Sequence, residues 1–133
     1  MEGEKAQALH PLKLAYIGDA VYTLYCRNKV VGSGHKPKQL HRMVTQKVRA
    51  GAQAEAMQSL WRHLTNREEE IAKRGRNTHA GHSCPKGATT EEYALSTAFE
   101  ALVGYLYLTK QHERLQTLLT IIEVENAKDS FAY

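Results

Sequence analysis

Apolar residues recur at spacings of three and four along most of the chain, and this periodicity constrains the fold more than any other feature. It predicts helices over residues 12–31, 37–46, 48–64, 65–74, 90–109 and 111–127. No segment sustains the apolar–polar alternation that would indicate a half-buried strand. The 133 residues suffice for one domain with its own core. The sequence therefore predicts a single all-α domain, with the helix over residues 90–109 buried at its centre and a flexible polar segment over residues 1–10.

Two carboxylates stand in segments that are otherwise apolar. Asp19 lies in LAYIGDAVY and is the only acid between residues 5 and 54, and Glu100 lies in STAFEALVGYLYL and is the only acid between residues 93 and 112. An unpaired carboxylate removed from water costs several kcal/mol or is protonated. A protein that keeps a carboxylate inside a core-forming helix therefore usually places a cation beside it. Here we expect that cation to be a divalent metal ion.

The residues around the two acids are small. Gly18 and Ala20 flank Asp19, and Gly104 lies four residues after Glu100. Residues four apart share a helix face, so we expect room there for an ion and a substrate phosphate. Oxygen ligands of this kind suit Mg²⁺, with Mn²⁺ as a substitute. For either acid alone, a place at the polar edge of its helix or a salt bridge to a nearby Lys or Arg is the alternative.

Positive charge is concentrated in one part of the chain. The formal net charge is +4, yet residues 20–54 contain no acid and these basic residues: Arg27, Lys29, Lys36, Lys38, Arg42, Lys47 and Arg49, with His35 and His41. Such asymmetry favours a polyanionic partner, because neutralised phosphates release counterions. An ordinary basic surface would look the same, so charge alone leaves nucleic acid binding open.

Residues 75–89 lack periodicity and include glycines and a proline, which predicts a loop. Basic and polar residues precede and occupy this segment, and such a loop suits recognition of double-stranded RNA by shape. The candidate RNA-binding residues are Lys73, Arg74, Arg76, Asn77 and Lys86. A merely solvated loop is the alternative. A zinc site at His79, His82 and Cys84 is disfavoured, because their spacing lacks the paired layout of structural zinc sites.

Cysteine usage and hydropathy bear on the location of the protein. Cys26 and Cys84 lie in dissimilar surroundings, which favours two free thiols in a reducing compartment. No signal segment opens the sequence, and no apolar run approaches the length of a membrane span. We therefore expect a cytoplasmic protein that does not enter a membrane.

Three motifs together resemble the ribonuclease III endonuclease-domain family, and most closely its Mini-ribonuclease III branch: LAYIGDA, then KRGRN, then YALSTAFEALVGYLYL. The resemblance implies that residues 1–133 form one catalytic domain, a helical homodimer that cleaves double-stranded RNA with Mg²⁺ and leaves 5′-phosphate ends. It also implies that Asp19 and Glu100 are catalytic metal ligands. Tyr16 matches the family's aromatic dimer contact, although core packing explains a tyrosine there equally well. The branch implies maturation of bacterial large-subunit (23S) ribosomal RNA.

The chain departs from the family pattern at several acidic positions. Ala15 and Leu12 stand where the larger enzymes have glutamates, and Thr97 stands where they have an aspartate. Only two of the four usual acids remain, Asp19 and Glu100, which leaves the number of metal ions open. The hydroxyl group of Thr97 or Ser96 is a candidate to hold a metal-bound water. The double-stranded RNA-binding domain that commonly follows is not in this sequence, so RNA contacts are expected from the catalytic domain itself.

Two other classes of function stay open on sequence alone. Loss of half of the usual acids is compatible with a non-catalytic RNA-binding or ribosome-associated scaffold on the same fold. The short basic helices between residues 37 and 64 are compatible with a small DNA-binding regulator. Covalent catalysis is disfavoured, because the scattered histidines lack partners in any nucleophile pattern.

Overall fold

The described part of the protein is entirely helical, as the periodicity predicts. The computed structural model describes residues 1–78 and 86–131. Its helices are α1 (Gly3–Gln7), α2 (Pro11–Val30), α3 (Pro37–Val48), α4 (Ala50–Leu60), the 3₁₀ turn η1 (Trp61–His63), α5 (Asn66–Asn77), α6 (Thr90–Leu108) and α7 (His112–Phe131). None of these helices combines the length and apolar character that a membrane span requires.

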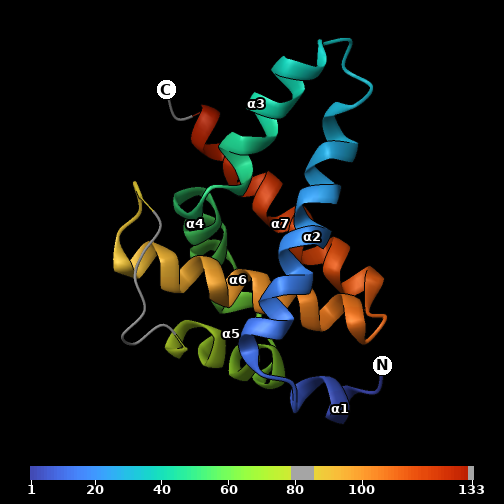
Figure 1. Ribbon diagram of the computed structural model, residues 1–133, viewed down its shortest axis with the longest axis vertical. Coiled ribbons are helices and arrows are strands. Elements are labelled where there is room, and N and C mark those ends of the chain that lie inside the picture. The colour runs from blue at the N-terminus through green and yellow to red at the C-terminus, as the bar shows by residue number, and fades with distance from the viewer. Residues whose placement is uncertain (79–85, 132–133) are drawn as a thin grey trace.

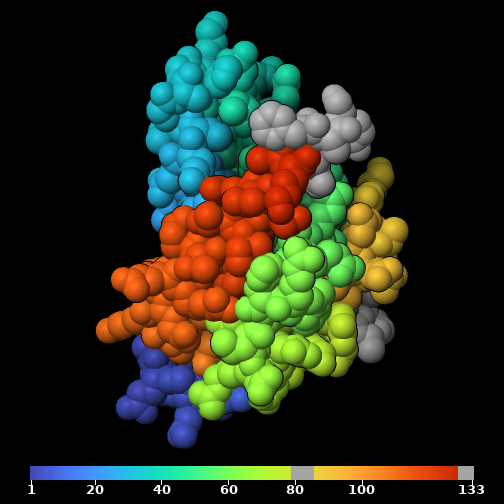
Figure 2. Space-filling model, turned by 180° about the vertical axis from the view of Figure 1, so that it is seen from behind, coloured from blue at the N-terminus to red at the C-terminus, as the bar shows by residue number. Residues whose placement is uncertain are grey.

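Helix α6 is the centre of the molecule, which confirms the prediction for residues 90–109. Figure 1 shows α2 crossing α6 on one side, with α4 and α5 packed along it, and Figure 2 shows α7 lying across the opposite face. Almost every residue from Leu95 to Leu106 is buried, and Phe99, Leu102 and Leu106 are completely inaccessible. A helix that is apolar all round requires such cover on every side.

Local sequence signals set the ends of several helices. Thr65 accepts a hydrogen bond from the Glu68 backbone while the Glu68 carboxylate accepts one from the Thr65 backbone, and Thr89 and Glu92 repeat this capping box before α6. One boundary differs from expectation. The segment predicted as a helix over residues 48–64 starts only at Ala50, because the chain is extended at Arg49, and it divides into α4 and η1 after Leu60.

The crossing of α2 and α6 depends on two glycines. A Cβ atom at Gly18 would lie 1.7 Å from the backbone oxygen of Glu100, and a Cβ atom at Gly104 would lie 1.9 Å from the backbone oxygen of Leu14. The backbones of the two helices are therefore in direct contact. This corrects the expectation that the small residues leave room for an ion: at Gly18 and Gly104 they allow the helices to approach each other.

The amino-terminal segment is folded, in contrast to the flexible segment expected over residues 1–10. Helix α1 buries Ala6 completely, and the terminal ammonium group donates a hydrogen bond to the Leu108 carbonyl over 2.8 Å. The guanidinium group of Arg74 donates to the carbonyl oxygens of Gln7 at 2.6 Å and Leu9 at 3.3 Å. Long-range hydrogen bonds, which periodicity does not report, fix this segment.

The loop expected over residues 75–89 begins later than predicted. Helix α5 continues through Gly75 to Asn77, because the bare Cα of Gly75 allows close packing against Ala98 and Ala101 of α6. Residues 79–85, which include His79, His82 and Cys84, lie outside the described residues. Cys26 is buried and carries a free thiol, as expected.

Candidate active site

The structure brings Asp19 and Glu100 together. The glycine crossing places the turn of α2 that carries Asp19 against the turn of α6 that carries Glu100. Their carboxyl groups are close enough for Asp19 to raise the pKa of Glu100. Within residues 1–78 and 86–131 neither acid forms an ion pair with a lysine or arginine. The salt-bridge alternative is therefore not found in this part of the chain, whereas Asp19 is exposed, as the alternative of a position at the polar edge of its helix expects.

The environment of Glu100 strongly disfavours its charged form. Burial raises the pKa of Glu100 most, and the hydrogen bond and charge repulsion from Asp19 raise it further, to about 8. The side-chain amide of Gln53 acts in the opposite direction. A cation between the two carboxyl groups would relieve the repulsion, so the pair is electrostatically prepared for a bound metal ion.

Gln53 is a member of this cluster that the sequence interpretation missed. It lies in the second turn of α4, its side chain is 2% exposed, and its amide is close enough to act on Glu100. A signal was present in the sequence: Gln53 lies four residues before Met57 and seven before Leu60, both fully buried, so it occupies the core face of α4. Three helices, α2, α4 and α6, thus each contribute one polar side chain.

The hydroxyl groups near Glu100 are engaged with the backbone. Ser96 donates to the Tyr93 carbonyl at 2.8 Å, and Thr97 donates to the same carbonyl at 3.1 Å. Among the described residues, no group of three or more acids, histidines or cysteines is placed so that it could hold a metal ion. Two carboxylates nevertheless fit Mg²⁺, which keeps several water ligands and is commonly bound by one or two carboxylates together with substrate phosphates.

Comparison with known proteins agrees with this geometry. The protein-family model for the ribonuclease III domain matches residues 12–111, a range that includes Asp19, Gln53 and Glu100. The chain belongs to the ribonuclease III domain family. The Mini-ribonuclease 3 of Symbiobacterium thermophilum is 47% identical over 112 residues, which cover 84% of this chain and 85% of that protein. The Mini-ribonuclease 3 of Thermoanaerobacter sp. is 43% identical over 119 residues, which cover 89% and 83%.

A solved structure supports the same assignment. A crystal structure of a Fusobacterium nucleatum protein superimposes with a TM-score of 0.82 at 28% identity, covering 90% of this chain and 95% of that one. Together with the relatives, this places the chain in the Mini-ribonuclease III branch, as the sequence motifs indicate, and makes it an endoribonuclease of the ribonuclease III type. The scaffold and DNA-binding alternatives receive no support from these relatives.

In this ribonuclease III domain, Tyr16 is on the surface. Its side chain is 79% exposed, so the core-packing alternative is wrong. Leu12, Leu24 and Val31, on or just beyond the same helix, are also large, apolar and exposed. Leu12, Tyr16 and Leu24 are four or eight residues apart, so they share one face of α2. The domain thus presents an apolar stripe, here defined as Leu12, Tyr16, Leu24 and Val31.

The five candidate RNA-binding residues have different surroundings. Arg74 is directed into the protein, where it holds the α1 segment. Lys73 pairs with Glu69 at 2.6 Å, and the Arg76 guanidinium lies over the Trp61 ring at 5.4 Å from its centroid. Both remain at the surface, as do Asn77 and Lys86. Four of the five side chains are therefore exposed, and Arg74 is partly buried, with its guanidinium group on the carbonyl oxygens of the α1 segment.

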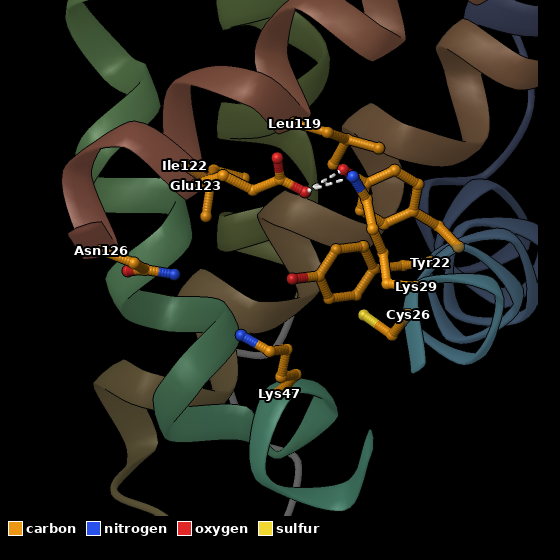
Figure 3. Close-up of a pocket in the computed structure, with 9 residues that line it drawn as sticks. Tyr22, Cys26, Lys29, Lys47, Leu119, Ile122, Glu123 and Asn126 are labelled. Carbon is orange, nitrogen blue, oxygen red and sulfur yellow. Dashed lines mark hydrogen bonds and ion pairs between the residues drawn. The ribbon is translucent and has the colours of Figure 1, made fainter. Parts of the chain in front are cut away.

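A separate cavity of about 310 Å³ lies between α2, α3 and α7. Lys29 and Glu123 form an ion pair of 3.1 Å on its wall, and Figure 3 shows these two side chains facing each other. Tyr25 donates a hydrogen bond to the same carboxylate. Burial raises the pKa of the Tyr22 hydroxyl on its wall. A second lysine, Lys47, also lines the cavity, whereas Asp19 and Glu100 do not. The cavity is therefore not part of the acid cluster.

Proposed function

We propose that this protein is a divalent-metal-dependent endoribonuclease that cleaves double-stranded RNA, with Asp19 and Glu100 as its catalytic metal ligands. One observation carries the proposal. Two carboxylates from distant parts of the chain meet at the α2–α6 crossing, and no basic side chain of the described residues pairs with either. Such a pair is unfavourable when both groups are charged, and either a proton on Glu100 or a bound cation relieves the repulsion.

The cofactor proposed is Mg²⁺, with Mn²⁺ as a substitute. When bound, a divalent ion activates water and stabilises the developing charge of a phosphodiester under attack. The contribution of the chain is to hold that ion from two helices. Asp19 is exposed and Glu100 is partly buried, so an ion held by both would be accessible to an RNA phosphate from solvent. Hydrolysis of the bond to the 3′-oxygen leaves a 5′-phosphate end.

The proposed substrate is a ribosomal RNA precursor, specifically that of the bacterial large-subunit (23S) RNA, in the cytoplasm. The resemblance to the Mini-ribonuclease III branch supports it, together with the excess of positive charge. Among the five candidates, Lys73, Arg76, Asn77 and Lys86 are accessible for contacts to phosphates and 2′-hydroxyls. Arg74 supports such contacts only indirectly, by anchoring α1.

We further propose that the protein acts as a homodimer. The apolar stripe on α2 is the supporting observation, since soluble proteins rarely leave several large apolar side chains exposed on one helix. In a twofold pair, each α2 packs against its copy, and Tyr16 is a central contact. The two acid pairs would then act on one RNA duplex, one on each strand.

The test of the catalytic proposal is the variant Asp19→Asn, which keeps the shape of the side chain and removes its charge. We expect duplex RNA cleavage in Mg²⁺ to fall about 10³-fold, equivalent to about 4 kcal/mol of transition-state stabilisation, with duplex RNA binding unchanged. Glu113→Gln, an exposed position on α7, is the matched control and should keep parent activity. Parent activity in Asp19→Asn would refute the proposal, and a parent protein that binds duplex RNA without cleaving it would favour a scaffold.

A further inference from the structure

The Gln53 side chain is buried beside the acid pair with an unused hydrogen-bond donor. Of the buried side-chain nitrogen and oxygen atoms in residues 1–78 and 86–131, only Nε2 of Gln53 has no hydrogen-bond partner. The amide is close enough to Glu100 to influence it, yet the donor does not reach the geometry of a formed hydrogen bond. A buried amide left in this state costs about 1–3 kcal/mol.

The position of Gln53 is set by its helix. Helix α4 packs along α6, and its first turn is so close that a Cβ atom at Gly51 would lie 2.9 Å from the Glu92 carboxylate. The same helix buries the side chain of Gln53. Glu100 therefore has two polar neighbours from different helices, the Asp19 carboxyl group of α2 and the uncharged Gln53 amide of α4.

Packing alone does not explain a glutamine at this position. Its neighbours on the buried face of α4 include Met57 and Leu60, and an apolar side chain of similar size would fill the same space without an unsatisfied polar group. Buried polar groups that lack a partner in the free protein commonly belong to functional sites. An amide next to a carboxylate has a definite use, since its N–H group can fix the orientation of a metal-binding oxygen.

We propose that Gln53 is a positioning residue of the metal site. When a divalent ion is bound between the two acids, Nε2 of Gln53 donates a hydrogen bond to the Glu100 carboxylate and holds it facing Asp19. This inference rests on the proposed function, because it assigns Gln53 to the same metal ion. Gln53 itself touches neither the ion nor the RNA.

The experiment compares Gln53→Met, a near-isosteric residue without a donor, with Gln58→Met on the exposed face of the same helix. Mn²⁺ binding without RNA is measured by electron paramagnetic resonance, and cleavage is measured as separate kcat and KM values. For Gln53→Met we expect the Mn²⁺ dissociation constant to rise and kcat to fall, each about tenfold or more. KM for duplex RNA and the helical circular dichroism spectrum should not change. Gln58→Met should behave as the parent.

The outcomes separate this inference from the proposed function. Parent values for both kcat and Mn²⁺ affinity in folded Gln53→Met would overturn it, while Asp19→Asn still tests the nuclease independently. If Gln53→Met does not fold, Gln53→Leu decides, because it lacks the N–H donor, adds no charge beside the two acids and suits the buried neighbours Met57 and Leu60. A fall in kcat of about tenfold in folded Gln53→Leu supports the role of the donor, and parent kcat overturns it.

Discussion

The contact between α2 and α6 makes a specific prediction about Gly104. In Gly104→Ala, the new methyl group would lie 1.9 Å from the Leu14 oxygen and 3.0 Å from the Gly18 nitrogen, whereas ordinary contacts begin at 3.4 Å. All of these neighbours are backbone atoms, so no side-chain rotation relieves the overlap. The two helices must separate by roughly 1.5 Å, the difference between the ordinary and the observed distance to the Leu14 oxygen.

The cost follows from two opposing effects. Forcing an extra methyl group into a packed interface costs about 3 kcal/mol when backbones must move. Alanine is favoured over glycine within a helix by about 1 kcal/mol. We therefore expect the free energy of unfolding to fall by about 2 kcal/mol or more. Because Asp19 and Glu100 lie at the same crossing, the separation should also weaken Mn²⁺ binding.

The assay is urea-induced unfolding followed by circular dichroism, at one fixed protein concentration so that self-association does not shift the result. Gly32→Ala is the matched control: a Cβ atom at Gly32 would meet nothing within 4 Å, so its stability should remain near that of the parent. A Gly104→Ala protein as stable as the Gly32→Ala protein would show that the helices are not in backbone contact. It would also refute the conclusion that this contact positions Asp19 against Glu100.

Two further predictions concern the acid pair and the surface of α2. In the metal-free protein the pKa of Glu100 is raised from 4.5 to about 8, so between these pH values the folded state binds more protons than the unfolded state and stability falls as pH rises. At about 1.4 kcal/mol per pKa unit, the loss of unfolding free energy is at most about 5 kcal/mol. The measurement is the urea midpoint as a function of pH in EDTA, and Glu100→Gln should flatten the profile in this pH range. An equally steep profile in the variant would assign the slope to other groups. Tyr16→Glu places a charge on the apolar stripe and should convert a dimer to a monomer in light scattering, with unchanged helical content; a parent protein that is already monomeric at assay concentrations would contradict the proposed dimer.

The sequence alone predicted most of the local structure. Helices form where apolar residues repeat at helical spacing, and the capping boxes at Thr65 and Thr89 depend on residues only three apart. The two lone acids were also visible, because a charged residue in an apolar segment is conspicuous without any knowledge of the fold. The family motifs, which include both acids, were sufficient to indicate a ribonuclease III domain.

Only the tertiary structure decided how these elements meet. Gly18 and Gly104 were interpreted as space for an ion, but they are the points where two backbones touch. Arg74 is a candidate RNA-binding residue by sequence, and the structure adds that it anchors α1 through carbonyl groups more than sixty residues away in the chain. The sequence does not single out Gln53, because a glutamine in an alanine-rich helix has no evident role until its neighbours in the fold are known. Periodicity indicates which face of a helix is buried. Which helix packs against that face depends on contacts between segments that are distant in the sequence, and the acid cluster is formed by such contacts.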